Sequence, residues 1–424
     1  MTMTIASAQM TKRADVTGHR VTGLVLLVIG LAIFGLFGAA LEPGLETKFG
    51  LNPGFGSQAI KIPDLVLPTQ PAIYMLAGMA VFFGAWQLAR GFRSVGAVIG
   101  IVAFCFIAAF LLWAARGKTF NLVGMLSSSL VRATPIALAA LCGVISERAG
   151  VVNIAIEGIM LMATQTAVVS ATISGNLYVG LVVAILTGML LAAIHAFLAI
   201  KFKVDQIVSG VAINIFATGA TSFISSRFLE RNTDVLNNSG TFPVIAIPLL
   251  SKIPILGPIF FANNIIVYLM ILLVVALHVL LFYTPWGLRT RAVGEHPKAA
   301  DTLGINVYLM RYVNVILGGA IAGVGGAYFS IGSVGRFDEI MTAGKGFIGL
   351  AAMIFGKWNP VGAFFSSLLF GFADSLQVKL QILRVPIPSE FLLMAPYIVT
   401  MVVLAGVVGR AIPPAADGVP YEKD

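Results

Sequence analysis

Long apolar runs occupy most of the sequence, and they constrain the fold more than any other feature. Eleven of them have the length of about 20 residues that a helix needs to cross a bilayer. They cover approximately residues 21–41, 72–89, 95–115, 121–145, 151–173, 177–200, 204–228, 263–284, 309–332, 360–380 and 388–409. A twelfth run, at about 344–357, is short and suits a half-helix. We nevertheless count it as crossing, because the basic residues at its end and near the C-terminus then fall on the same side of the membrane as most of the others. The sequence therefore predicts an all-α polytopic membrane protein with about 11–12 transmembrane helices.

The charge content agrees with lipid as the main solvent. Hydrophobic residues make up 58% of the chain and charged residues 11%, with a mean hydropathy of +0.96, whereas an ordinary soluble domain has about 25% charged residues. The net charge is +9, but the 27 Lys and Arg are scattered between apolar runs, so a nucleic-acid partner is not expected. Fifteen of these 27 fall on one side of the expected membrane, which we assign to the cytoplasm together with the N-terminus.

The order of the runs suggests four regions. They are a cytoplasmic N-terminal tail at 1–20, an accessory membrane region at 21–120, a core at 121–410 and a cytoplasmic C-terminal tail at 411–424. The first apolar run is longer than the core of a signal peptide, so we expect it to remain as an anchor. Five prolines between 42 and 71 predict an irregular external loop, and a second external loop is expected at about 229–262.

Ionisable and amide side chains inside the runs are candidates for function, because they are costly in lipid unless they face protein or water. Asn153 and Glu157 are four residues apart and would share one face of a helix. They could line a translocation path, or Glu157 could be a buried carboxylate that caps a neighbouring helix. Both interpretations remain open from the sequence.

A second group recurs at every fourth position. Gln206, Gly210 and Asn214 would lie on one face of their helix, either along a path or as interhelical hydrogen bonds. Asp374 lies deep within its run, which favours a cavity wall or an external gate. These observations make Asn153, Glu157, Gln206, Asn214 and Asp374 the substrate-pathway candidates.

Small residues and histidines within the runs favour packing rather than chemistry. Gly319 and Gly323, with Gly326 one turn later, allow close helix approach. His195 and His278 have no carboxylate at helical spacing, so we expect packing roles for both. Cys105 and Cys142 form neither a metal-type cluster nor a redox pair, and no metal site is expected.

The segment 286–306 is the longest loop assigned to the cytoplasmic side. Pro297 at a first-turn position, Ala299 and Ala300, and Gly304 as a stop predict a short amphipathic helix, with an ordinary basic loop as the alternative. Gly117-Lys118-Thr119 imitates the end of a phosphate-binding loop, but Leu112 stands where the first glycine is required. We therefore expect no enzymatic activity on this chain and no cofactor bound to it.

Several ordered segments together resemble a known family. They are SERAGVVNIAIEG at 146–158, DQIVSGVAIN at 205–214, RAVGEHPKAADTLGI at 291–305, FGKWNPVG at 355–362 and APY at 395–397. Over about residues 121–420 the chain resembles the membrane subunits of bacterial nucleoside-type ABC importers, within the permeases for branched-chain amino acids, ribose and other simple sugars.

The resemblance implies a permease core similar to the type II, vitamin-B12-like importers, here with three extra N-terminal helices. It implies a second permease subunit in a heterodimer, ATPase subunits that carry ATP and Mg²⁺, and an extracytoplasmic substrate-binding lipoprotein. The loop at 286–306 would contact the ATPase. The residues expected to couple it are Arg291, Gly294, Glu295, Pro297, Ala299, Ala300 and Gly304.

The expected function is passage of nucleosides, with purine nucleosides such as guanosine favoured, across the bacterial cytoplasmic membrane. The same machinery carrying ribose or another simple sugar is the nearest alternative. An ion-coupled secondary transporter is a further alternative, as is a membrane scaffold that transports nothing.

Overall fold

The computed structural model is built almost entirely from helices. It describes residues 19–39, 41–52, 61–92, 94–394 and 411–423. Within these ranges ten helices are long and apolar enough to cross a membrane. Ten of the eleven expected full-length runs are therefore helical, and most of the eleventh, at 388–409, lies outside the described residues.

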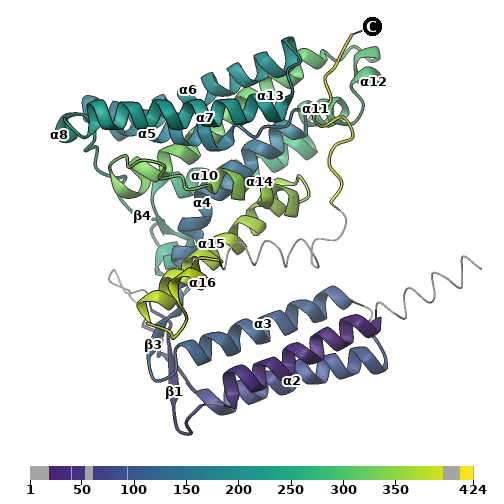
Figure 1. Ribbon diagram of the computed structural model, residues 1–424, viewed down its shortest axis with the longest axis vertical. Coiled ribbons are helices and arrows are strands. Elements are labelled where there is room, and N and C mark those ends of the chain that lie inside the picture. Colours follow the sequence, from purple (N-terminus) through teal and green to yellow (C-terminus); the bar gives the residue numbers. More distant parts are fainter. Residues whose placement is uncertain (1–18, 40, 53–60, 93, 395–410, 424) are drawn as a thin grey trace, which may run out of the picture. The chain divides into compact units, whose positions relative to one another are not determined.

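The helices follow one another with short connections (Figure 1). After a first helix at His19–Gly38, the longer ones are α2 Thr69–Ala89, α3 Val95–Ala114, α4 Leu122–Glu147, α5 Ile156–Ser174, α6 Leu177–Ala196, α7 Gln206–Ile224, α10 Ile265–Tyr283, α13 Val307–Phe329 and α15 Pro360–Ile382. The shorter ones are α8 Thr233–Leu236, α9 Leu256–Phe260, α11 Pro285–Glu295, α12 Pro297–Thr302, α14 Lys345–Phe355 and α16 Ser389–Leu393. A wider turn, η5 Ser330–Val334, prolongs α13, and similar turns prolong α6 and α7.

The chain divides into two compact units. The first comprises residues 1–124 and 379–388, and the second comprises 125–378 and 389–424. Helix α14 belongs to the second unit and has 11 residues, which at 1.5 Å per residue span about 16 Å. It has the half-helix length expected from the sequence, shorter than the hydrocarbon core of about 30 Å.

The first unit contains a small sheet where an irregular loop was expected. Strand β1, Glu46–Gly50, pairs antiparallel with β2, Leu65–Pro68, and parallel with β3, Thr119–Asn121. The expectation of an irregular loop at 42–71 was therefore wrong in part, while the fold as a whole is helical as expected. The prolines do not prevent regular structure here. Strand β2 is an edge strand, where a missing amide donor costs nothing, and Pro71 lies in the first turn of α2.

The second unit is organised around α5, α6 and α13, which pack on one another, while α7 packs on α5 (Figure 1). Glycines make the closest contacts possible. A Cβ atom at Gly323 would lie 2.4 Å from the carbonyl oxygen of Ala184 on α6, and one at Gly326 would lie 2.3 Å from that of Met160 on α5. At Gly319 the carbonyl of Gly188 on α6 would be 2.4 Å away. One helix, α13, thus presents glycine to two neighbours.

The loop at 229–262 carries two further short strands, β4 Ile245–Ala246 and β5 Ala262–Asn263, which pair antiparallel. This pairing joins the middle of the loop to its end, directly before α10 begins in the sequence. Asn264 caps the first turn of α10. This loop therefore has more structure than its content of proline and asparagine suggested.

Candidate functional site

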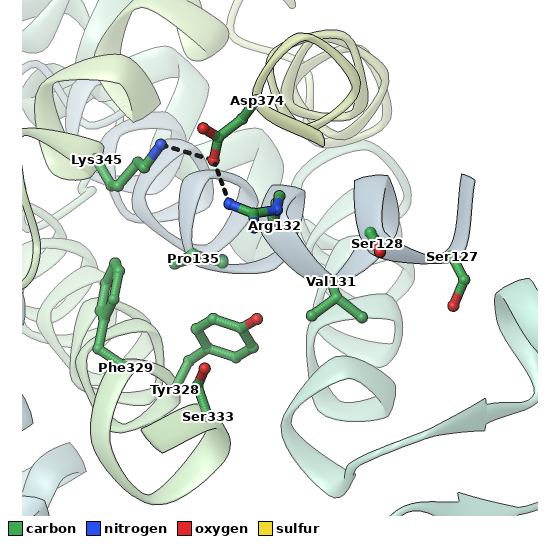
Figure 2. Close-up of a pocket in the computed structure, with 10 residues that line it drawn as sticks. All are labelled: Ser127, Ser128, Val131, Arg132, Pro135, Tyr328, Phe329, Ser333, Lys345 and Asp374. Carbon is green, nitrogen blue, oxygen red and sulfur yellow. Dashed lines mark hydrogen bonds and ion pairs between the residues drawn. The ribbon is translucent and has the colours of Figure 1, made fainter. Parts of the chain in front are cut away.

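A cavity of about 350 Å³ lies inside the second unit, among α4, α13, η5, α14 and α15 (Figure 2). This volume is within the range of small-molecule sites. Its lining combines hydroxyl, aromatic and charged groups: Ser127, Ser128, Val131, Arg132, Pro135, Tyr328, Phe329, Ser333, Lys345 and Asp374. Four of the five elements, α4, α13, η5 and α15, are parts of candidate membrane spans, and the fifth is the half-helix α14, so the cavity is lined by the apolar helices of the fold.

Three charged groups meet at one side of this cavity. The carboxylate of Asp374 accepts from Arg132 Nη1 at 3.3 Å and from Lys345 Nζ at 3.0 Å, both at the same oxygen, Oδ2. Figure 2 shows both cations pointing toward the carboxylate. Ionisable groups within spans are stabilised by such mutual pairing, and two cations against one carboxylate leave this wall with net positive charge.

Asp374 was expected at a cavity wall, but its partners were not identified. Arg132, inside the run at 121–145, and Lys345, at the start of the short run at 344–357, were not among the candidates. The available signal was that both cations lie in or beside apolar segments, where each needs a carboxylate. The sequence does not indicate which carboxylate, because 242 residues separate Arg132 from Asp374.

Glu157 has a different place. It lies in the first turn of α5, and its carboxylate accepts from Thr342 Oγ1 at 2.6 Å, Gly344 N at 2.9 Å and Gly346 N at 2.7 Å. These donors belong to the start of α14, where backbone N–H groups have no partner within the helix. Glu157 therefore caps α14 with a negative charge at its positive end. It supports the helix that carries Lys345.

Asn153 does not share a helix face with Glu157. Helix α4 ends at Glu147, Gly150 has a φ of +80°, and residues 151–155 are not helical before α5 begins at Ile156. Asn153 is buried in this non-helical segment, where its Oδ1 accepts from Ala155 N at 3.1 Å. The shared face expected from spacing was wrong because the chain leaves the helical path between them.

One face of α7 stabilises that non-helical segment. Gln206 Oε1 accepts from Val152 N at 2.7 Å, Asn214 Oδ1 accepts from Gly158 N at 2.7 Å, and Asn214 Nδ2 donates to Ile154 O at 2.9 Å. A Cβ at Gly210, between them, would lie 2.9 Å from Ala155 N. Non-helical backbone at membrane depth needs such partners, because lipid offers none.

His195 adds to the same network. Its Nε2 lies 2.9 Å from the carbonyl oxygen of Val152, and its Nδ1 lies 3.0 Å from Ser209 Oγ. Since a carbonyl only accepts, Nε2 carries the proton and Nδ1 accepts from the serine hydroxyl. Among the five pathway candidates, Asp374 thus lines the cavity and Glu157 caps α14. Asn153 lies within the 151–155 segment, and Gln206 and Asn214 bind the backbone of that segment and of α5.

The helix pair α11–α12 occupies residues 285–302. His296 separates the two helices and caps the second, with Ala299 N donating to its Nδ1 at 3.1 Å, and Pro297 is the first residue of α12. Gly304, with a φ of +80°, follows its end. The short helix expected after Pro297 is therefore present, and a second helix, α11, precedes it.

Contacts fix this pair on one side and leave it open on the other. A Cβ at Gly294 would lie 2.2 Å from Arg148 O, Ala300 is buried, and the Arg291 guanidinium lies 5.1 Å from the centre of the Phe282 ring. Leu288 and Leu303 are 63% and 82% exposed beside a cavity of about 660 Å³. Glu295 Oε2 accepts from Ala415 N at 3.2 Å.

Comparison with known proteins identifies the family. A family model described as "Branched-chain amino acid transport system / permease component" matches residues 125–412, and the chain belongs to this family. It is a multi-pass membrane permease component of a transporter, as the sequence segments indicated. No solved structure matches it.

Three curated proteins illustrate the range of relatives. The guanosine ABC transporter permease protein NupQ of Bacillus subtilis is 45% identical over 309 residues, covering 70% of this chain and 95% of NupQ. The nucleoside ABC transporter permease protein NupC of Lactococcus lactis is 42% identical over 310 residues, covering 70% and 96%. The guanosine ABC transporter permease protein NupP of Bacillus subtilis is 25% identical over 277 residues, covering 64% and 77%.

Proposed function

We propose that this chain is the permease subunit of an ATP-driven ABC importer that moves nucleosides, with purine nucleosides such as guanosine favoured, across the bacterial cytoplasmic membrane. The observation that carries the proposal is the similarity to NupQ, which extends over 95% of that protein. The permease core would resemble the type II, vitamin-B12-like importers, with the helices of the first unit as an accessory region.

The cavity beside Asp374 is the proposed substrate site. A nucleoside offers a planar base, which stacks on aromatic rings, and ribose hydroxyls, which donate to carboxylates and accept from serine and cations. Tyr328, Phe329, three serines and the charged cluster supply these partners. Asn153, Gln206 and Asn214 would act indirectly, by holding the turn between α4 and α5.

The pair α11–α12, which we call the coupling element, is the proposed contact with the ATPase. Its outer side has exposed leucines, and its inner side is held by Gly294, Ala300 and Arg291. ATP binding and hydrolysis on the partner chains, which hold the Mg²⁺, would move this element and bias the spans between inward and outward states. A second permease, for which the B. subtilis pair of NupP and NupQ is a precedent, and a binding lipoprotein would complete the importer.

Reconstitution of the whole complex in liposomes tests this function. We expect uptake of radiolabelled guanosine that requires ATP and is competed by other purine nucleosides but not by ribose. Asp374→Asn should raise the substrate concentration for half-maximal uptake, because Asn lacks the charge that holds both cations. Asp338→Asn is the matched control, since Asp338 pairs with Arg336 on an exposed surface.

Two other results would redirect the proposal. Competition by ribose or another simple sugar, with no effect of nucleosides, would assign the chain to sugar import. Uptake that continues without the ATPase and follows an ion gradient would indicate a secondary carrier.

A further inference from the structure

The C-terminal residues 411–423 lie against the coupling element (Figure 1). Ala416 N donates to the carbonyl of Gly294 at 2.8 Å, at the end of α11, and Ala415 N donates to Glu295 Oε2 at 3.2 Å. Lys423 pairs with Asp301 of α12 at 3.3 Å. The segment thus contacts both helices of the element along its length.

The same segment is fastened to elements that do not belong to the coupling element. Arg311 of α13 donates from Nη1 to Val419 O at 2.9 Å, and Lys203, which follows α6, pairs with Glu422. Asp417 forms a hydrogen bond with Glu147 at the end of α4. Residues 411–423 therefore connect α11 and α12 to the end of α4, the segment that follows α6 and the first turns of α13.

Tyr421 is the apolar centre of this contact. Its side chain is 5% exposed and forms one cluster with Val293, Ala300, Val307 and Met310. Its ring centre lies 5.3 Å from that of Tyr308, with the planes inclined at 60°. Without Tyr421 the inner side of α12 would lose its aromatic partner, because Ala300 and Val293 cannot fill the same volume.

We propose that residues 411–423, with Tyr421 as the anchor, position the coupling element against α4 and α13, so that its movement by the ATPase is transmitted to the spans around the cavity. The inference rests on the proposed function only in naming an ATPase as the partner that moves the coupling element. The positioning itself rests on the contacts above. Tyr421 is a positioning residue and touches no substrate.

The transmission is tested by the coupling ratio, defined as nucleoside molecules taken up per ATP hydrolysed by the reconstituted complex. Tyr421→Ala should lower this ratio while assembled complex and basal ATP hydrolysis are retained, because the element would move without its attachment. Tyr421→Phe keeps the ring and should restore most of the ratio. Ile412→Ala, whose side chain is 78% exposed in the same segment, is the matched control.

The positioning is tested independently by hydrogen exchange on the full chain in detergent. Amides of α12 should exchange on the order of threefold to tenfold faster in Tyr421→Ala, the equivalent of a lost aromatic pair. Unchanged exchange at α12, or a coupling ratio that stays at the wild-type value, would overturn the inference. Failure of the wild-type complex to take up nucleosides would instead refute the proposed function, and the exchange result would still decide the positioning.

Discussion

The ammonium group of Lys345 lies 3.0 Å from the carboxylate of Asp374, and Arg132 binds the same oxygen at 3.3 Å. Helix α14 brings Lys345 to this point because Glu157 holds the backbone amides on either side of it. One carboxylate thus positions the helix, and a second carboxylate receives the cation that the helix carries.

The first prediction concerns the pairing itself. Lys345→Met and Asp374→Asn should show a coupling energy of about 1 kcal/mol in a double-mutant cycle, since the groups are only partly buried. The measurement is the free energy of unfolding in detergent for the two single variants and the double variant. Additive effects of the two substitutions would show that the ion pair contributes nothing.

The second prediction concerns Glu157. Both carboxylate oxygens of Glu157 accept hydrogen bonds. Glutamine keeps only one accepting oxygen, and its NH₂ group would face a backbone N–H that also donates. Glu157→Gln should therefore destabilise the protein by about 1.5–3 kcal/mol. Thermal unfolding of the purified chain measures this, and uptake should fall with it because Lys345 loses its position. Glu230→Gln, at an exposed position, should leave stability within about 0.5 kcal/mol of wild type.

The third prediction concerns the glycines of α13. A methyl group at Gly323 meets the Ala184 carbonyl at 2.4 Å, so Gly323→Ala should cost about 1–3 kcal/mol by forcing α6 and α13 apart. Gly219 of α7 has nothing within 4 Å of an added Cβ, and Gly219→Ala should be neutral or stabilising by up to about 1 kcal/mol. Equal effects of the two substitutions on unfolding would contradict this explanation.

The fourth prediction is a pH dependence at the C-terminal segment. Burial raises the pKa of Asp417 from its ordinary value of 3.8 to about 6, although the hydrogen bond with Glu147, the Gly418 amide and the charge of Arg311 act in the opposite direction. Between these two pKa values the docked segment binds a proton that the undocked segment does not bind. Docking should therefore strengthen as the pH falls through 6 and weaken toward neutrality.

The size of this effect follows from the same pKa values. Between pH 7.5 and 5.5 the gain is roughly 1 kcal/mol. Hydrogen exchange of residues 411–423, corrected for the intrinsic effect of pH, measures it. Asp417→Asn should weaken the dependence, and a dependence of unchanged size in that variant would assign it to another group.

The membrane spans could be predicted from the sequence because each apolar run carries its own signal. The cavity could be predicted only in part. Asp374 was identified by its depth in a span, whereas Lys345 was not, since its partner is set by the packing of α14 against α5 rather than by local sequence.

The turn between α4 and α5 shows why helix periodicity fails locally. Residues 151–155 are apolar enough to continue a helix, yet side chains of α7 and His195 satisfy their backbone groups in a non-helical path. These partners lie more than 40 residues away in sequence, so no window of local sequence contains them. The four-residue spacing of Asn153 and Glu157 therefore predicted a shared helix face, but Asn153 lies outside the helix.

The capping of α14 by Glu157 also has a consequence for biosynthesis. Thr342, which binds the same carboxylate, is separated from Glu157 by 185 residues, and an isolated helix of 11 residues is marginal by itself. The ribosome synthesises α5 long before α14, so the Glu157 carboxylate is present before the backbone amides at the start of α14 emerge. We therefore expect α14 to form by docking onto α5, and errors in the insertion of α5 to leave α14 without its capping group.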